Sequence, residues 1–452
     1  MTRTARELAA DILNRVEEDK SYVNLLLTAK LGQLDNPPDR RLTTSLVNGV
    51  IKHRLTLEYA LRQHMRTGLS ALPREIRQIL RLGAFQLLFM DRIPAAVSVH
   101  ESVEQAKKAQ GKYAGLVNGV LRHVGDRGWD LPWPDQRREP VRYLSVRYSH
   151  PEWLVTRWYR RWGLAETEAL CRLNNEPAPA WIRTNTLKIS RPELLVRLRE
   201  EGVTAEPGER TPESLVIRDY GSIDQLPGFR AGLFTVQDES SQLAAHLVAP
   251  QAGDYVLDAC SAPGGKTTHL AQLMGNLGHI TAYDVHPHKL ELIEDLAARL
   301  GITIIETRTG DARELPGLAP GTQDRVLVDA PCSGLGVLRR KADARWRKEE
   351  RDITELPKLQ LAILGRAAAM VRPGGVLVYS TCTIEPEENF EVLKAFRAGH
   401  PEFKPVDISE GLPFRLEDER DSRQAQKGML QLLPQRHGTD GFFLAELRRV
   451  GV

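Results

Sequence analysis

Two cysteines that each follow an apolar run are the residues of this sequence best suited to chemistry. Cys332 lies in Asp-Ala-Pro-Cys after the run 326–328, and Cys382 lies in Ser-Thr-Cys-Thr after the run 376–379. Such runs are typical of buried parallel strands, and open α/β sheets bind their ligands at the carboxyl ends of these strands. We therefore predict that both thiols reach the same edge of one sheet.

A glycine-rich segment follows a third apolar run, residues 255–257, and opens a predicted helix. Gly264 and Gly265 would let the backbone approach a ligand closely at the start of that helix. A phosphate-binding P-loop would need glycine where this chain has Cys260, and the dinucleotide motif G-x-G-x-x-G is absent. We interpret the segment as the turn of a site for another nucleotide-like cofactor.

Two aspartates follow this turn at the ends of further predicted strands. Asp284 closes the strand 280–283 and would accept hydrogen bonds from ribose hydroxyls, while Asp311 closes the third strand and would accept from an adenine amino group. Taken alone, each aspartate is better interpreted as a turn or helix-cap residue. Their order behind a glycine-rich turn favours ligand binding.

The two thiols suit methyl transfer to C5 of a cytosine. That carbon is a poor nucleophile until a thiolate adds to C6 and a hydrogen-bonding acid at N3 stabilises the adduct. A base must then remove the C5 proton so that the thiol can leave. Cys382, Asp329 and Cys332 could supply these three groups. Most free cysteines are small buried hydrophobes, but two cysteines at strand ends disfavour that interpretation.

Composition limits the class of protein. The 452 residues suffice for about three domains, and no apolar run reaches the roughly 18 residues of a membrane span. The four cysteines form no C-x-x-C pair and the twelve histidines show no metal spacing, so we expect no disulfide framework and no metal. The N-terminus shows no pattern of a signal or transit peptide. These features favour a reduced, cytoplasmic thiol enzyme.

Periodicity and charge divide the chain into three parts. Residues 1–130 carry helical apolar stripes and a net charge of +6, and a motif at 46–53 recurs at 116–123. Residues 131–235 carry +2 and predict a linker and a small α+β domain. Residues 236–452 carry −5 and alternate strands and helices as in a doubly wound parallel sheet. The basic front suits contact with nucleic acid, although charge alone fits a solvated surface equally well.

The motifs of the rear part resemble the RNA (cytosine-5) methyltransferases of the Sun/Nop type, a class I, Rossmann-like family that uses S-adenosyl-L-methionine. In that family the Thr-Cys cysteine is the nucleophile and the Pro-Cys cysteine aids product release. The resemblance therefore implies that Cys382 attacks and that Cys332 helps to resolve the adduct. It places cofactor contacts on Cys260, Ser261, Ala262, Pro263, Gly264, Gly265, Lys266, Asp284, Asp311 and Asp329.

Further segments extend this resemblance. Residues 234–241 and 437–443 also match the family, and the Glu-Asn-Val motif of the DNA enzymes is absent, which favours RNA. Segments 80–88, 97–108 and 117–121 resemble the Nus B antitermination family, an all-helical RNA-binding fold. This front joined to this rear resembles the bacterial small-subunit ribosomal RNA methyltransferase B family. The resemblance implies small-subunit (16S) ribosomal RNA as the substrate, and we expect a monomer with no DNA or membrane partner.

Weaker signals and alternatives remain open. The basic run 339–348 suits phosphate contact at the ligand edge of the sheet, or else a solvated helix face. The run 157–162 suits RNA, or an amphipathic helix with a buried tryptophan, and Cys171 is expected in the core. The alternatives for function are the same chemistry on transfer RNA and a non-catalytic RNA-binding antitermination scaffold.

Overall fold

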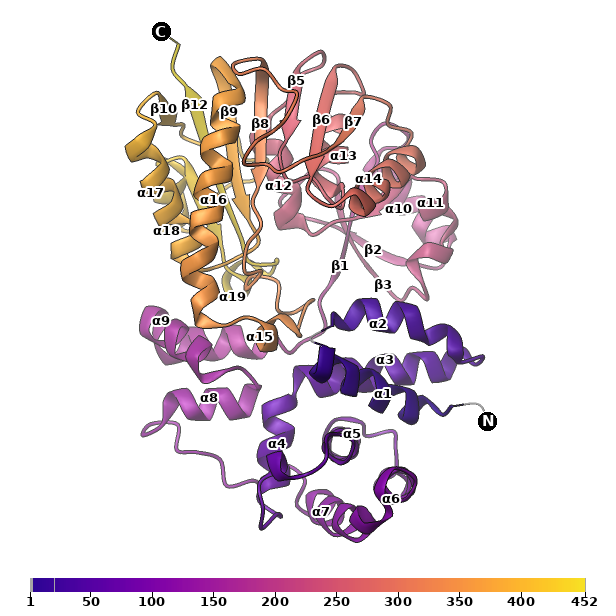
Figure 1. The fold of residues 1–452 in the computed structure, drawn as a ribbon. Helices are drawn as coiled ribbons and strands as arrows, with labels where there is room; N and C mark the ends of the chain where they lie inside the picture. The colour runs from indigo at the N-terminus through magenta and orange to yellow at the C-terminus, as the bar shows by residue number, and fades with distance from the viewer. Residues whose placement is uncertain (1–2, 20, 452) are drawn as a thin grey trace. The chain divides into compact units, whose positions relative to one another are not determined.

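The chain forms two compact units, one helical and one built on sheets (Figure 1). The computed structural model describes residues 3–19 and 21–451. The helical unit comprises Met1–Glu176 and Leu338–Lys348, and the sheet unit comprises Pro177–Val337 and Glu349–Val452. The chain therefore leaves the sheet unit shortly after the Asp-Ala-Pro-Cys motif and returns to it eleven residues later.

Residues 8–131 of the helical unit share one hydrophobic core. The predicted stripe of the first helix is confirmed, since Leu8, Ile12 and Leu13 are buried there. The two repeated segments lie in α3, with residue 53 just beyond its end, and in α7, and both contribute to that same core. Its helices are α1 Ala5–Asp19, α2 Val23–Lys30, α3 Pro37–Lys52, α4 Arg54–Arg62, α5 Arg74–Phe89, α6 Ala95–Gln110, α7 Ala114–Arg127, α8 Pro140–Tyr148, α9 Glu152–Leu173 and α15 Ala344–Arg347.

Helix α9 contains the basic and aromatic run 157–162. Trp158 is fully buried, as in the amphipathic alternative, and Cys171 of the same helix is also in the core, as expected. Gly163 interrupts the helix with a φ of 74°, a left-handed conformation that glycine adopts without strain. The buried face of α9 therefore serves packing.

Arg345 of α15 holds the inserted segment, Leu338–Lys348, in the helical unit through hydrogen bonds. Its fully buried guanidinium donates to the carbonyl of Ser149 and to the side chain of Asn175, both at 2.9 Å. It also donates at 3.3 Å to the carbonyls of Lys52 and Asn174. These acceptors lie at the carboxyl-terminal ends of α3, α8 and α9, where helix dipoles favour a cation. This corrects the phosphate interpretation of the run 339–348 for Arg345, because its charge is committed to these helix ends.

The smaller sheet of the sheet unit is antiparallel with strand order β2-β3-β1-β4. Ile182, Leu215 and Phe234 of three of its strands are buried against Leu194 and Leu198 of α10. The elements are β1 Ala180–Thr184, α10 Arg191–Glu200, β2 Thr204–Pro207, β3 Ser214–Arg218, α11 Pro227–Arg230 and β4 Phe234–Val236. This is the α+β arrangement predicted for the middle of the chain.

The larger sheet has the order β10-β12-β9-β8-β5-β6-β7, with β11 paired to β12. Strands β5 to β9 are parallel and β12 is antiparallel, so the predicted α/β class is confirmed. Its strands are β5 Tyr255–Asp258, β6 His279–Asp284, β7 Ile305–Thr309, β8 Gln323–Asp329, β9 Val371–Thr381, β10 Phe403–Pro405, β11 Met429–Leu432 and β12 Phe442–Arg449. Its helices are α12 Glu239–Val248, α13 Gly265–Leu273, α14 Pro287–Leu300, α16 Glu350–Met370, α17 Phe390–Gly399, α18 Glu419–Ala425 and α19 Pro434–His437.

The order of the larger sheet reverses between β5 and β8, which is the position where doubly wound sheets bind ligands. Asp258 pairs in register with Leu327, and Asp329 pairs with Ser380. The carboxyl ends of β5, β8 and β9 are therefore level with one another. The glycine-rich segment and both cysteine motifs begin at this edge.

Candidate active site

The glycine-rich turn between β5 and α13 is held by its own backbone and by β6. Gly264 has a φ of 96°, and a side chain there would meet the Cα of Ile293 at 3.2 Å, so glycine is required. Ser261 donates its amide and its hydroxyl to the carbonyl of Tyr283, at 2.8 and 2.9 Å. The turn is thus fixed close to the helix that follows β6, with the start of α13 behind it.

Asp258 lies buried beneath this turn. One of its oxygens accepts from the hydroxyl of Thr267 at 2.7 Å, and the other has no partner among the described residues. Burial raises the pKa of Asp258 to about 7, with a further contribution from the charge of Asp329 and an opposing one from the Thr267 hydrogen bond. A buried acceptor without a partner beside a glycine turn fits a site that is completed by a polar ligand.

Cys260 lies near four carboxylates, of which Asp284, Asp311 and Asp329 were predicted as site residues. Its pKa is raised by burial and then by the charges of Asp258, Asp329, Asp284 and Asp311. These residues come from the ends of different strands, so the sheet has brought them to one place, as predicted. Asp311 lies two residues beyond the end of β7, rather than at its end.

Two of these carboxylates have partners of their own. Asp284 accepts from the amide of His286 at 2.9 Å and lies 3.8 Å from the ammonium of Lys289. Asp311 is bound through both oxygens by the guanidinium of Arg313, which lowers its pKa. A ligand that uses Asp311 must therefore share that carboxylate with Arg313.

Lys266 connects the glycine-rich turn to the first cysteine motif. Its ammonium donates to Asp329 at 2.8 Å, and the other oxygen of Asp329 accepts from the hydroxyl of Ser380 at 2.8 Å. Burial lowers the pKa of Lys266, but the charge and hydrogen bond of Asp329 outweigh burial and leave it raised. The pair holds a cation and an anion in fixed positions at the sheet edge.

The two predicted cysteines meet at this edge. The sulfur atoms of Cys332 and Cys382 lie 3.4 Å apart, and each side chain keeps part of its surface exposed. The pKa of Cys332 is raised by its contact with the Cys382 sulfur, by burial, and by the charges of Glu388 and Asp329. Cys382 instead interacts with the Lys266 cation, because the charge of Cys382 raises the pKa of Lys266. The two thiols therefore differ in their surroundings, since a cation acts on Cys382 and carboxylates act on Cys332.

Comparison with known protein families covers almost the whole chain. The model of the 16S rRNA methyltransferase RsmB/F family matches residues 245–448, and the NusB family model matches residues 3–126. The RsmF/B-like ferredoxin-like domain matches residues 150–224. Among curated proteins, the probable ribosomal RNA small subunit methyltransferase B of Bacillus subtilis is 40% identical over 99% of both chains. This chain belongs to the ribosomal RNA small subunit methyltransferase B family.

Other members and solved structures agree with this membership. The methyltransferase B of Erwinia tasmaniensis is 34% identical over 98% of both chains. The crystal structure of PH0851 is 29% identical with a TM-score of 0.80, covering 99% of this chain and 100% of that one. The structure of NSun6 from Pyrococcus horikoshii with SFG is 26% identical with a TM-score of 0.59, covering 67% of this chain and 99% of that one. The expected family and the all-α, α+β and α/β architecture are thereby confirmed.

This member of the methyltransferase B family has a buried network beside its cysteines that sequence reasoning missed. Glu388 accepts from the amide of Ser333 at 2.8 Å, from the hydroxyl of Thr383 at 3.0 Å and from the amide group of Gln360 at 3.0 Å. Burial raises the pKa of Glu388, and these hydrogen bonds oppose the shift. Glu388 lies six residues beyond Cys382 among other acidic residues, and only that proximity could have identified it.

Close backbone contact also fixes the cysteine loops of this methyltransferase B relative. Gly336 donates to the carbonyl of Cys382 at 3.0 Å, and Gly441 donates to the carbonyl of Gly336 at 2.8 Å. A Cβ on Gly336 would lie 2.2 Å from the Gly441 oxygen and 2.8 Å from the Cys382 oxygen. The segment 437–443, which the family resemblance had singled out, therefore supports the Thr-Cys turn.

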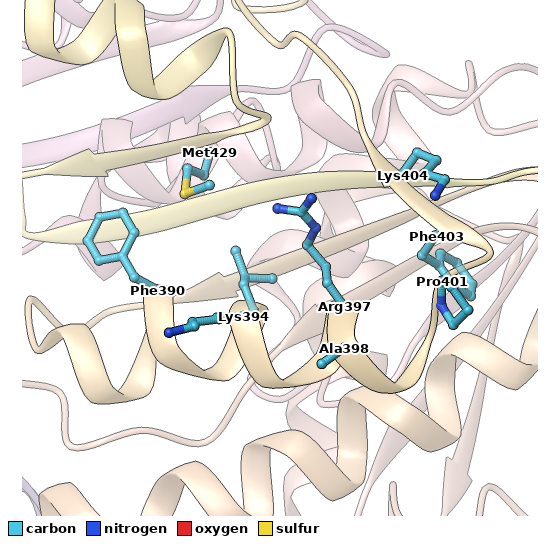
Figure 2. A pocket seen from close by; sticks show the side chains of 9 residues that line it. Phe390, Lys394, Arg397, Ala398, Pro401, Phe403, Lys404 and Met429 are labelled. Carbon is cyan, nitrogen blue, oxygen red and sulfur yellow. The ribbon is translucent and has the colours of Figure 1, made fainter.

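Two further features of this methyltransferase B relative lie outside the cysteine site. A cavity of about 460 Å³ runs along α17 between Phe390 and Lys404, and none of the predicted site residues lines it (Figure 2). Glu213, His246 and His269 bring three possible metal-ligand atoms within 4.8 Å of one another, a grouping that sequence spacing did not indicate. No helix within residues 3–19 and 21–451 has the length and apolar character needed to span a membrane.

Proposed function

We propose that this chain transfers the methyl group of S-adenosyl-L-methionine to C5 of a cytosine in small-subunit (16S) ribosomal RNA. The observation that carries the proposal is the pair of sulfur atoms 3.4 Å apart at the carboxyl ends of β8 and β9, beside Lys266. A cation beside one thiol favours the anionic form that a nucleophile needs. Carboxylates beside the other thiol favour the neutral form that suits a group assisting release. The names of the curated relatives supply the substrate class.

The residues at the glycine-rich turn fit the cofactor. The segment 260–266 would hold it, with Asp284 toward the ribose, Asp311 toward the adenine amino group and Asp329 near the reacting end. The unpartnered oxygen of Asp258 and the close approach at Gly264 support a polar ligand against this turn. A relative, NSun6 from Pyrococcus horikoshii, has been solved with SFG, an analogue of S-adenosyl-L-methionine. When bound, the cofactor supplies an electrophilic methyl group on sulfur.

Cys382 begins the reaction in this proposal. Its thiolate, favoured by Lys266, adds to C6 of the cytosine, and the ring becomes nucleophilic at C5 as the C5–C6 double bond is lost. As the adduct forms, N3 takes up a proton from solvent, and this N3–H donates to the Asp329 carboxylate, which Lys266 and Ser380 hold in place. Fixed charges at the point where ring charge develops lower the barrier without reorganisation.

Cys332 ends the reaction in this proposal. After C5 has accepted the methyl group, a water molecule removes the C5 proton. The electrons of the C5–H bond then restore the C5–C6 double bond, and the C6–sulfur bond breaks to release Cys382 as a thiolate. Cys332 lies in contact with that leaving sulfur, and its raised pKa keeps it as a neutral thiol close to the departing charge. Cys332 therefore assists release, and it does not compete with Cys382 for C6.

The helical unit is the proposed RNA-binding part. A cavity of about 600 Å³ in this unit is lined by Arg62, Arg142 and Lys348, together with the aromatic side chains of Tyr59 and Trp153. Cations combined with aromatic rings are typical of surfaces that bind single-stranded RNA through phosphates and bases. A paired cytosine would have to leave its stack at a cost of a few kcal/mol, so we expect a loop or helix-end target.

The decisive experiment incubates the purified chain with unmodified small-subunit ribosomal RNA and methyl-labelled S-adenosyl-L-methionine. Label is expected in 5-methylcytidine after nucleoside digestion, and Cys382→Ala is the matched inactive control. Label in another nucleoside, or none at all, contradicts the proposal. Transfer RNA is tested in parallel, because preferential labelling there favours the alternative substrate.

A non-catalytic RNA-binding scaffold is the second candidate function. Calorimetry separates it from the enzyme, since a scaffold with a relic fold would bind no S-adenosyl-L-methionine. We also keep the domain boundaries near residues 130 and 235, a monomeric state and a cytoplasmic location as predictions. Limited proteolysis and sedimentation of the full chain test the first two.

A further inference from the structure

Glu388 connects the two loops that carry the cysteines. One carboxylate oxygen accepts from the amide of Ser333, the residue after Cys332, and from Gln360. The other accepts from the hydroxyls of Ser333 and Thr383, and Thr383 is the residue after Cys382. All four donors lie in the sheet unit, and the Glu388 side chain is almost fully buried.

The surroundings hold the Glu388 carboxylate in a fixed position. We call its hydrogen bonds to Ser333, Thr383 and Gln360 the Glu388 bracket. Glu388 ends a short 3-10 turn, Pro386–Glu388, and its own carbonyl accepts from the hydroxyl of Tyr379 in β9 at 2.7 Å. Gln360 of α16 also donates to the carbonyl of Pro331 at 3.0 Å, so the residue before Cys332 is held by the same helix. The residues on both sides of Cys332 are thus tied to Glu388 directly or through Gln360.

Cys332 needs such a bracket because its segment has little regular structure. The chain between β8 and α15 forms turns, and it soon leaves the sheet unit. Cys382, by contrast, directly follows the paired strand β9. The amide bond of Ser333 to Glu388 and the 2.8 Å contact between the Ser333 and Thr383 hydroxyls therefore add to the Gly336–Cys382 backbone bond in joining this segment to the strand end.

We propose that Glu388 is a positioning residue that sets Cys332 against Cys382 for release of the methylated product. It acts through Ser333 and Thr383, the residues that follow the two cysteines. The proposal rests on the release role proposed above for Cys332. Without the bracket, Cys382 still ends a strand and still forms the adduct, but Cys332 is displaced from the leaving sulfur.

Two variants at position 388 distinguish a need for the hydrogen bonds from a need for the negative charge. In Glu388→Gln the amide oxygen can face the Ser333 amide and Gln360, while the amide nitrogen faces two hydroxyls that can accept. This variant keeps the bracket, whereas Glu388→Ala removes it. Glu391→Ala, an exposed position on the neighbouring helix α17, is the matched control. Thr383→Val removes the hydroxyl that contacts Glu388, Ser333 and the amide of Glu385 but keeps the Glu388 carboxylate, and it replaces Glu388→Ala if that variant fails to fold.

The first measurement is independent of methylation. Dibromobimane joins two thiols by losing two bromides, and peptide mass spectrometry identifies a Cys332–Cys382 cross-link in the protein without RNA. Wild type, Glu391→Ala and Glu388→Gln should cross-link at similar rates, and Glu388→Ala at least several-fold more slowly. Equal rates in wild type and Glu388→Ala overturn the proposal, even if the proposed function holds.

The second measurement uses the full reaction with unmodified ribosomal RNA. Glu388→Ala should raise the ratio of denaturant-resistant RNA–protein adduct to methylated product, as expected when release alone is slowed. A merely structural defect lowers adduct and product together and overturns the positioning role. If wild type and Cys332→Ala form no adduct at all, the proposed function fails, while the cross-linking result still stands or falls separately.

Discussion

The ammonium of Lys266 lies 2.8 Å from Asp329 and joins the glycine-rich turn after β5 to the first cysteine motif after β8. One ion pair therefore links the proposed cofactor segment to the proposed catalytic edge. Lys266 also interacts with the charge of Cys382. A coupling between two charges acts equally on both groups, so the lysine that gains from the thiolate also stabilises it.

Lys266→Met is expected to lower the fraction of Cys382 that is ionised at neutral pH. Removal of this cation should move the rise in thiol reactivity to higher pH, because an opposite charge nearby favours the ionised form of a group. The pH dependence of iodoacetamide alkylation at Cys382, followed by mass spectrometry, measures this shift. Lys404→Met, an exposed position, is the control. An unchanged alkylation profile in Lys266→Met would remove the role assigned to the cation.

The Lys266–Asp329 pair should stabilise the fold throughout the neutral range. The pKa of Lys266 is raised above its ordinary 10.5. Its contribution is therefore complete below pH 10.5 and is lost only as the pH rises through the folded-state value. Denaturant unfolding of wild type and Lys266→Met should differ at pH 8 and converge in strongly alkaline solution.

The cysteine variants should separate attack from release. Cys382→Ala is expected to abolish both methylation and covalent RNA adduct, because no sulfur then adds to C6. Cys332→Ala should accumulate an adduct that survives denaturant, because attack proceeds while release is slowed. Gel electrophoresis of labelled ribosomal RNA with each variant checks both expectations. An adduct in Cys382→Ala that is absent from Cys332→Ala would reverse the two roles.

Asp258 should make stability fall as the pH rises from about 4 toward 7. Its folded-state pKa is raised to about 7 from an ordinary value of 3.8. Between these values the unfolded chain loses its proton while the folded chain retains it, so unfolding becomes easier by up to roughly 4 kcal/mol. Above pH 7 this contribution is constant. Asp258→Asn should flatten this part of the stability profile, and an unchanged slope would contradict the assignment.

The ends of the strands, and the position of both cysteines at those ends, were predictable because buried parallel strands appear in the sequence as apolar runs. The run 326–328 fixed the position of Cys332, and the run 376–379 fixed that of Cys382. Glu388 was not predictable, since nothing in its local sequence distinguishes an inward carboxylate from the exposed Glu391. Its orientation depends on the 3-10 turn after β9 and on donors that lie far away in the sequence.

Arg345 is a residue to which the sequence suggested a function that the structure does not support. A run of cations beside a catalytic motif suggests phosphate contact, because sequence shows charge and does not show acceptors. The acceptors are carbonyls at the ends of three helices, and they come together only when the helical unit folds. Basic composition alone therefore could not distinguish a structural arginine from an RNA-binding one.

Gly336→Ala is expected to disturb the Thr-Cys turn. The added carbon would lie 2.2 Å from the carbonyl oxygen of Gly441 and 2.8 Å from that of Cys382, both of them backbone atoms that cannot rotate away. Overpacking of this kind costs about 1–3 kcal/mol, and a displaced nucleophile loses on the order of 10²-fold in rate. Gly399→Ala, where no atom lies within 4 Å, is the control. Thermal unfolding and methylation assays should show a loss for Gly336→Ala only.

Arg345→Met should loosen the ends of α8 and α9 within the helical unit. The variant leaves the carbonyl of Ser149 and the side chain of Asn175 without their buried donor. Each buried group without a partner costs about 1–3 kcal/mol, so protection from hydrogen exchange in these helices should fall by a comparable free energy. Arg351→Met, whose side chain is 76% exposed, should leave that protection unchanged. If the two variants exchange alike, the helix ends do not depend on Arg345, and the inserted segment must be held mainly by the apolar packing and indole hydrogen bond of Trp346.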